Sequence, residues 1–221
     1  MLSTEANAIL TDMYSATQLE GLDGRVEIDR TSSVGRTKGR ELNRLVRENG
    51  VAKSLEVGLA YGFSTIWIMD GLAPGGSHIA IDPYQSSTWK GVGATQARRL
   101  AADRFQLLEQ YSVHALSDFA RAGESFDFIF IDGNHRFDDV IVDFYLSDQI
   151  LKTGGVMVLD DAWMASIRSA FSFILANRAY EIVPQESTRM VALRKMHDDD
   201  RSWRHFRPFT VFTGQHGGLD G

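Results

Sequence analysis

Acidic side chains stand at the ends of several short apolar segments of this sequence, and they are the residues best suited to chemistry. They are Glu56, Asp82, Asp132 and the adjacent Asp160 and Asp161. Helix capping could account for one or two of them, because aspartate is a good N-cap after a strand. A whole row of carboxylates repels itself unless cations or cationic ligands lie among them. The pattern therefore indicates a site for a cation or a positively charged ligand.

A glycine-bearing turn follows the first of these acids. Gly58 and Gly62 lie four residues apart, between an apolar segment and a helix expected to start near Ser64. Glycine lets the backbone approach a ligand closely, and the N–H groups at a helix start favour a carboxylate or phosphate. This indicates a nucleotide-type cofactor. The spacing is not G-x-G-x-x-G, which disfavours a nicotinamide or flavin dinucleotide.

Alternating strand-like and helix-like segments position these residues. We expect strands at residues 53–57, 78–81, 105–108, 126–131 and 156–159, separated by helices near 64–72, 93–102, 113–121, 137–151 and 164–177. Helical spacing also covers residues 3–19 and 37–49, and residues 180–183 and 190–193 could form a closing hairpin. Such alternation predicts an α/β fold with a doubly wound, mostly parallel, seven-stranded sheet and helices on both faces. Ligands bind at the carboxyl ends of its strands, where the acids lie.

The length of 221 residues is most simply one domain. We expect residues 1–35 to form an N-terminal helical cap, residues 36–195 the cofactor-binding core and residues 196–221 a C-terminal tail. The N-terminal helix and the tail are the natural candidates for subunit contacts in a homo-oligomer.

The bulk composition excludes several classes of function. The chain has no cysteine, which excludes disulfides, thiolate nucleophiles and cysteine-ligated metals. Its net charge of −6 argues against a nucleic-acid partner. The nearest approach to a basic patch is the arginine-rich stretch 36–47, which we interpret as the solvated face of an amphipathic helix. Neither a secretory signal nor a membrane-spanning run is recognisable, so a cytoplasmic protein with no membrane partner is expected.

Taken together, these motifs resemble the class I S-adenosylmethionine-dependent methyltransferases. Within them, the chain is similar to the small metal-dependent O-methyltransferases of the catechol O-methyltransferase type and to bacterial relatives that act on sugars and natural products. The resemblance runs from about residue 34 to residue 193. It implies a Rossmann-like methyltransferase fold, S-adenosylmethionine as the cofactor and methylation of a hydroxyl on a small molecule.

The resemblance also implies which residues bind the cofactor. The backbone near Val34 and the hydroxyl of Ser64 would meet the methionine carboxylate, and Asp82 would accept both ribose hydroxyls. Ser112 falls at the position of adenine contacts. For Asp82 the alternative is a cap for the following turn, and for Ser112 a plain helix cap. The remaining residues expected at the cofactor are Glu56, Gly58, Tyr61, Gly62 and Asp132.

The catalytic half of the resemblance is the pair of strand ends that carry Asp132 and Asp160–Asp161. These three carboxylates would hold Mg²⁺ or another hard divalent cation, which lowers the pKa of the substrate hydroxyl. Asp161 departs from the catechol-type enzymes, which have asparagine there. A metal-free interpretation, in which Asp160 and Asp161 cap the next helix, stays open.

Two further features adjoin these acids. His135 and Asp132 are the residues expected in catalysis, because His135 stands where the catechol-type enzymes place a lysine base. It could accept the hydroxyl proton, bind the metal or serve the loop as an ordinary polar residue. Trp163 and Met164 could wall the acceptor pocket or pack in the core.

Two other functions remain open from the sequence. One is methylation of a macromolecule, and the other is a non-catalytic protein that keeps the fold and binds the cofactor. The sequence carries no motif that identifies the methyl acceptor.

Overall fold

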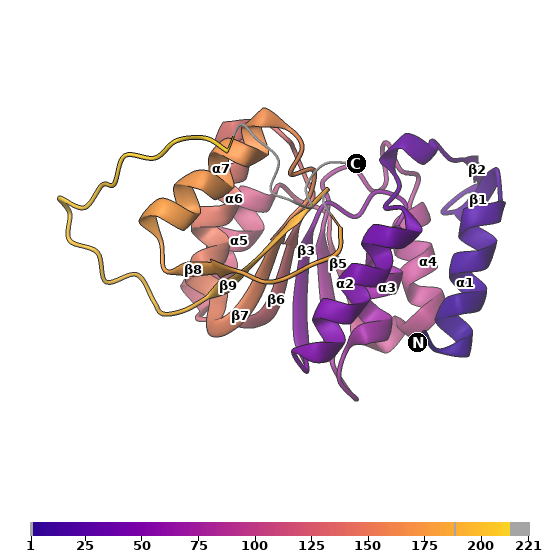
Figure 1. Ribbon diagram of the computed structural model, residues 1–221. Helices are drawn as coiled ribbons and strands as arrows, with labels where there is room; N and C mark the ends of the chain where they lie inside the picture. Colours follow the sequence, from indigo (N-terminus) through magenta and orange to yellow (C-terminus); the bar gives the residue numbers. More distant parts are fainter. Residues whose placement is uncertain (1, 188, 213–221) are drawn as a thin grey trace. The chain divides into compact units, whose positions relative to one another are not determined.

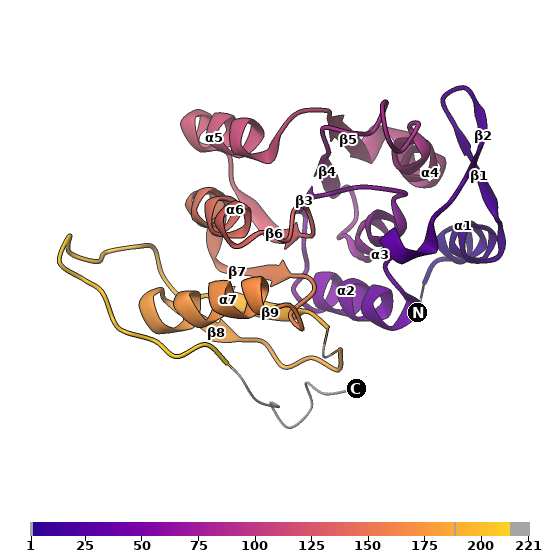
Figure 2. The ribbon, with the colours of Figure 1, turned by 90° about the horizontal axis from the view of Figure 1, so that it is seen from above.

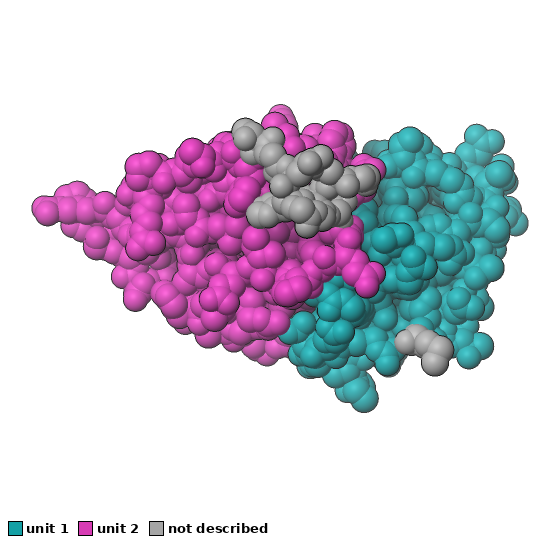
Figure 3. Space-filling view, in the orientation of Figure 1, with its two compact units in different colours: residues 1–115 teal, residues 116–221 magenta. Residues whose placement is uncertain are grey.

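The computed structural model describes residues 2–187 and 189–212. The chain divides into two compact units, residues 1–115 and residues 116–221, which are distinguished in Figure 3. The interpretation of the chain as a single domain stays a prediction. The Gly-rich end from Gly214 to Gly221, counted with the expected tail, lies outside the described residues.

The first unit alternates helices and strands after a short N-terminal hairpin (Figure 1). In chain order its elements are α1 (Thr4–Ser15), β1 (Gln18–Gly21), β2 (Gly24–Glu27), α2 (Arg36–Glu48), β3 (Lys53–Val57), α3 (Phe63–Gly71), β4 (Ser77–Ile81), α4 (Val92–Ala101) and β5 (Phe105–Leu108). Two short 3₁₀ turns, at Arg30–Ser32 and Ala102–Arg104, are inserted between them. Helix α5 (Ser112–Ala122) contains the boundary between the units.

The second unit continues the alternation and then closes with antiparallel strands. Its elements are β6 (Phe126–Ile131), α6 (Phe137–Ile150), β7 (Leu151–Leu159), α7 (Ala165–Asn177), β8 (Tyr180–Ile182) and β9 (Val191–Lys195). Strand β9 pairs antiparallel with both β7 and β8, which confirms the closing hairpin expected near residues 180–193. Fully buried phenylalanines from β6, α6 and α7 dominate its core: Phe126, Phe128, Phe130, Phe144 and Phe171.

Seven strands make up the mostly parallel sheet. In the first unit their order is β5-β4-β3, and in the second it is β6-β7-β9-β8. The pairs β3–β4, β4–β5 and β6–β7 are parallel. Each parallel pair is joined by a helix, as right-handed crossover connections require. The α/β fold class expected from the sequence is confirmed.

Helix α1 forms an outer layer of the first unit, because it packs on α3 and α4 rather than on the sheet (Figure 2). An ion pair of 3.1 Å between Arg99 Nη1 and Asp12 Oδ2 also joins α4 to α1. Helix α2 packs on α3, and the contact is close at Gly39. Within the described residues, no helix combines the length and the apolarity that crossing a membrane requires.

The expectation of a helix over residues 3–19 was wrong at its C-terminal end. Helix α1 stops at Ser15, and residues 18–27 form the β1–β2 hairpin with a two-residue turn at Leu22–Asp23. The N-terminal cap is therefore only partly helical. Gly24, directly after the turn, has a φ of +119°, a conformation that glycine adopts readily. The hairpin is held by Leu22 N, which donates to Lys90 O at 2.8 Å.

We predict that Gly39→Ala destabilises the protein although alanine is the better helix former. A Cβ at Gly39 would lie 2.2 Å from Trp67 Nε1. The overlap should lower the free energy of unfolding by about 1–3 kcal/mol, outweighing a propensity gain of about 1 kcal/mol. Chemical denaturation measures the change.

Gly35→Ala, at the N-cap position directly before the same helix, is the control. A Cβ at Gly35 meets nothing within 4 Å among the described residues, and its φ of −69° suits alanine. Equal effects of the two replacements on the free energy of unfolding would contradict the close α2–α3 contact.

Candidate active site

The glycine-bearing turn of the first unit connects β3 to the start of α3. Gly58 and Gly62 have φ angles of +93° and +81°, which a side chain would strain. A Cβ at Gly62 would also lie 2.9 Å from the carbonyl oxygen of Gly93. Helix α3 has no side-chain cap at its N-terminus, so its first N–H groups are available to an anionic group. Ser64, in this first turn, is buried.

Asp82 braces this turn. Its Oδ2 accepts hydrogen bonds from the backbone N–H groups of Leu59 at 3.2 Å and Ala60 at 2.9 Å, and Oδ1 accepts from Tyr84 N at 2.8 Å. The turn-cap alternative for Asp82 is therefore present in the structure. A carboxylate has about four acceptor positions, so Oδ1 retains capacity for a further donor such as a ribose hydroxyl.

Gln85 is a supporting residue that the sequence analysis missed. Its Nε2 donates to Ala60 O at 2.8 Å and to Asp82 Oδ2 at 3.1 Å, and its side chain is almost fully buried. Ala60 has a φ of +45°, an unfavourable conformation for a residue with a Cβ. Asp82 and Gln85 hold this strained residue from its N–H and its carbonyl. A lone glutamine after an acid gives no sequence signal for this role.

Glu56 lies inside the first unit rather than in an open site. It is fully buried, its Oε2 accepts a hydrogen bond from Thr65 Oγ1, and His78 Nε2 lies 3.2 Å from the same oxygen. Ser54 Oγ is in turn 2.8 Å from His78 Nδ1. Glu56 thus connects the end of β3 to α3 and β4. Its assignment to the cofactor stays a prediction.

The remaining residues expected at the cofactor have local partners. The carbonyl oxygen of Val34 accepts a hydrogen bond from Tyr14 Oη at 2.7 Å. Tyr61 Oη accepts from Asp29 N at 3.1 Å, and its ring packs edge-on to Trp89. Ser112 is the first residue of α5, so Tyr111, whose carbonyl accepts from Ala115 N, occupies the N-cap position rather than Ser112; the adenine contact stays a prediction. The structure thus gives Val34 and Tyr61 a role in holding the N-terminal segment.

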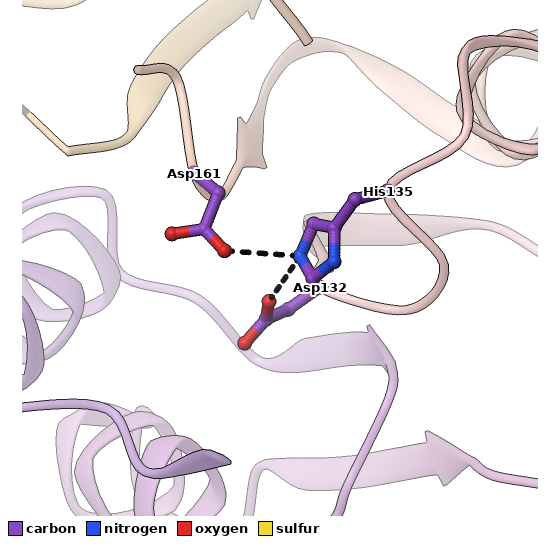
Figure 4. A group of neighbouring side chains, drawn as sticks. All are labelled: Asp132, His135 and Asp161. Carbon is purple, nitrogen blue, oxygen red and sulfur yellow. Dashed lines mark ion pairs between the residues drawn. The ribbon is translucent and has the colours of Figure 1, made fainter. Parts of the chain in front are cut away.

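In the second unit, Asp132, His135 and Asp161 converge at the ends of two parallel strands (Figure 4). Strands β6 and β7 pair with Ile131 opposite Leu159, so the residues that follow them lie at the same edge. His135 Nε2 is 3.5 Å from Asp132 Oδ1 and 3.1 Å from Asp161 Oδ2. One ligand atom from each of the three residues lies within 4.8 Å of the others, a geometry that could hold a metal ion.

The two carboxylates change the protonation of the histidine. Hydrogen bonding to Asp132, and then to Asp161, raises the pKa of His135 from its ordinary 6.5 to about 10. The imidazole is therefore protonated at neutral pH and supplies the positive charge that the acids need. An imidazolium has no lone pair to accept a proton, so His135 is a base only after the carboxylates are neutralised by another cation.

Asp160 lies outside this group of three. It is almost fully buried, and its backbone N donates to Ile131 O at 3.0 Å. Its expected role as a metal ligand stays a prediction. Asp161 has a φ of +50°, unusual for a residue with a side chain. Trp163 Nε1 donates to Asp161 Oδ1 at 3.0 Å, and the guanidinium of Arg189 lies 5.6 Å from the Trp163 ring.

Comparison with known proteins agrees with these observations. Residues 55–162 match the family model of a methyltransferase domain. Among curated protein sequences, none matched this chain significantly. Solved structures share the fold at low identity. An O-methyltransferase from Bacillus cereus, in complex with S-adenosylhomocysteine, is 20% identical with a TM-score of 0.66, over 87% of this chain and 91% of its own.

Two other solved structures are similar. The O-methyltransferase TomG from Streptomyces achromogenes, involved in tomaymycin synthesis and in complex with S-adenosylmethionine, is 17% identical with a TM-score of 0.67, over 89% of this chain and 92% of its own. The methyltransferase PaMTH1 from Podospora anserina, bound to S-adenosylhomocysteine, is 13% identical with a TM-score of 0.69, over 89% of each chain. The chain therefore matches a methyltransferase-domain model over residues 55–162 and shares the fold of these solved methyltransferase structures.

We predict that His135 stabilises the metal-free protein in a pH-dependent way. Because its pKa is raised on folding, the stabilisation is complete below the unfolded pKa of about 6.5 and is lost as the pH rises towards 10. The group is partly exposed, so His135→Gln should cost about 1 kcal/mol near pH 6, a fall in Tm of about 2–4 °C. Thermal unfolding between pH 6 and pH 10 in a chelator measures this.

The control is the same replacement in an Asp132→Asn background. There His135→Gln should have a smaller effect, because one partner carboxylate has been removed. A stability difference between wild type and His135→Gln that does not change with pH would contradict the assigned ion pairs.

Proposed function

We propose that this protein is an S-adenosylmethionine-dependent, divalent-metal-assisted O-methyltransferase that acts on a hydroxyl of a small molecule, such as a phenol, a sugar or a natural product. The observation that carries the proposal is the convergence of Asp132, His135 and Asp161 at adjacent strand ends within a methyltransferase domain. The O-methyltransferase neighbours, one of them involved in tomaymycin synthesis, support the reaction class and a small acceptor.

The turn between β3 and α3 suits S-adenosylmethionine. An uncapped helix start beside Gly62 can receive the methionine carboxylate, and Oδ1 of Asp82 retains capacity for a ribose hydroxyl. We assign cofactor binding to the following residues, as expected from the sequence: Val34, Glu56, Gly58, Tyr61, Gly62, Ser64, Asp82, Ser112 and Asp132.

The donor set of the second unit suits a divalent cation. Two carboxylates and one imidazole can ligate Mn²⁺ or Zn²⁺, whereas ligation by carboxylates alone, including that of Asp160, would favour Mg²⁺. A cation bound there would supply Lewis acidity that lowers the pKa of the acceptor hydroxyl.

The protein's own residues would then position the acceptor and remove its proton. Where carboxylates alone hold the cation, the charges of Asp132 and Asp161 would be compensated, and His135 would release its proton and could take the hydroxyl proton at Nε2. An imidazole that ligates the cation through Nε2 could not act as this base. S-adenosylmethionine, when bound, would supply the methyl group that its sulfonium gives up to the acceptor oxygen, and it would leave as S-adenosylhomocysteine. Trp163, held on Asp161, is a candidate wall for the acceptor.

Other assignments from the sequence stay predictions. A non-catalytic cofactor-binding protein of this fold would bind S-adenosylhomocysteine without using the acids. A macromolecular substrate is the second alternative, and the net charge of −6 disfavours a nucleic acid. The cytoplasmic location, the lack of a membrane partner and the homo-oligomer also remain to be tested.

We predict that S-adenosylhomocysteine at about 100 times its Kd raises the Tm by about 5–10 °C, since ligand binding to the folded state stabilises by about 2.7 kcal/mol. Asp82→Asn should reduce this shift, because the amide nitrogen cannot accept a ribose hydroxyl. Asp132→Asn should keep most of the shift but lose at least 100-fold in metal-dependent methylation of a catechol, flavonoid or sugar panel.

Asp127→Asn, on the strand that Asp132 follows, is the matched control for Asp132→Asn. Its carboxylate pairs with Lys152 at 2.6 Å and is not assigned to the site. The absence of any shift with S-adenosylhomocysteine in the wild type would refute the cofactor assignment. Full activity of Asp132→Asn would favour a metal-independent enzyme.

We also predict that metal binding releases a proton. At pH 7.5 His135 carries a proton because its pKa is about 10, and a cation at the carboxylates should displace close to one proton per site. Apparent affinity should therefore rise with pH up to about 10. Titration calorimetry with Mn²⁺ and Mg²⁺, in two buffers of different ionisation enthalpy, counts the protons.

His135→Gln should reduce the proton release to near zero. Proton release that is unchanged in this variant would show that another group titrates, and would remove His135 from the proposed mechanism.

A further inference from the structure

A basic groove lies in the first unit between the start of α1 and the exposed side of α2. Its volume is about 730 Å³, against about 380 Å³ for the polar pocket beside Arg178 in the second unit. Its lining includes Arg36, Arg40, Arg44, Arg47 and the acidic Glu48 of α2, with Asn7 of α1 and its N-cap residue Ser3. None of these residues belongs to the set assigned to the cofactor.

The arginines form one stripe because of their spacing along α2. Positions 36, 40, 44 and 47 recur every three or four residues, which places them on one side of a helix. The stripe is about 16 Å long, at 1.5 Å per residue. The sequence analysis interpreted this stretch as a solvated helix face. The structure confirms this, because Arg36, Arg40 and Arg47 are exposed, and it adds that the stripe lines a concave surface.

Two of the four guanidinium groups are not neutralised by acids. Arg44 forms ion pairs with Glu41 and Glu48. Arg36 and Arg40, in contrast, have no carboxylate within ion-pair distance in the part of the chain that the structure describes. The groove therefore has excess positive charge in a protein whose net charge is −6.

Arg36 is also held in place. Its guanidinium lies 4.3 Å from the centre of the Tyr14 ring. Tyr14 is itself fixed, since its hydroxyl donates to Val34 O at 2.7 Å and accepts from Trp67 Nε1 at 3.1 Å. A guanidinium stacked on a ring keeps its in-plane N–H donors for an oxyanion, and holding it beforehand reduces the entropic cost of binding.

The size and charge of the groove define the ligand class. A volume near 730 Å³ falls within the range for small-molecule sites. A ligand with a single carboxylate could not pair with all four arginines of the stripe. Arginine also pairs well with phosphate oxygens, of which a phosphorylated ligand has several. The overall negative charge disfavours a nucleic acid, so the ligand is a small molecule with more than one phosphoryl group.

We propose that the α1–α2 groove is a binding site for a phosphorylated small molecule, held by Arg36 and Arg40 and separate from the cofactor site. The site goes beyond the proposed methyl transfer and does not depend on it. The first unit would then have a second small-molecule binding site, in addition to the cofactor site.

Inorganic pyrophosphate, titrated calorimetrically in metal-free buffer at physiological ionic strength, tests the proposal. The wild type should form a saturable 1:1 complex. Arg36→Gln/Arg40→Gln should weaken it at least about 10-fold, since each charge-assisted hydrogen bond contributes about 1.5–3 kcal/mol. If the double variant is unstable, Arg40→Gln alone provides the test, because it keeps the Arg36–Tyr14 stack. It should show part of the loss of pyrophosphate affinity.

Arg98→Gln/Arg121→Gln is the control with the same change in net charge, on exposed arginines of α4 and α5. It should keep the wild-type affinity for pyrophosphate. Absence of saturable binding in the wild type, or equal weakening in both double variants, would overturn the proposal. Competition by S-adenosylhomocysteine would overturn it too, by placing the anion in the cofactor site.

Discussion

Asp132 and Asp161 are brought together by the pairing of β6 with β7, and two carboxylates at adjacent strand ends are unfavourable unless positive charge lies between them. The side chain of His135 supplies that charge, which is why its pKa rises to about 10. The same arrangement is ready to exchange the proton for a metal ion. The electrostatic requirement of these acids thus connects the fold of the second unit, the protonation of its histidine and the proposed chemistry.

The first unit uses a carboxylate differently. Asp82 is saturated on one oxygen by the backbone of the glycine-bearing turn, and Gln85 holds the same turn from its other side. The strained backbone at Ala60 persists because both partners fix it. A turn held in this way needs little reorganisation when a ligand arrives, so binding loses less entropy. Asp82 therefore contributes to a cofactor site first by shaping the turn.

The arginine stripe of α2 shows how one sequence pattern can have two meanings. Regular spacing of charged residues on a helix normally indicates a solvated face. Here residues near the start of α1 lie across from the stripe, and the exposed face becomes one wall of a groove. The fixed stack of Arg36 on Tyr14 depends on residues that are far apart in the chain but adjacent in the unit.

The sequence by itself determined the order of strands and helices, because apolar periodicity and the residues that end each helix or strand are local properties. It also placed Asp132 and Asp161 at strand ends, since acids that follow buried strands of a parallel sheet share an edge. The prediction was wrong at residues 18–27, where a hairpin stands in place of part of the expected helical cap. Only the tertiary structure decided that His135, and not Asp160, lies between the two carboxylates. The direction of the loops and the burial of the side chains decide which residue lies between the carboxylates. Both depend on contacts between residues that are distant in the sequence, which a local pattern cannot predict.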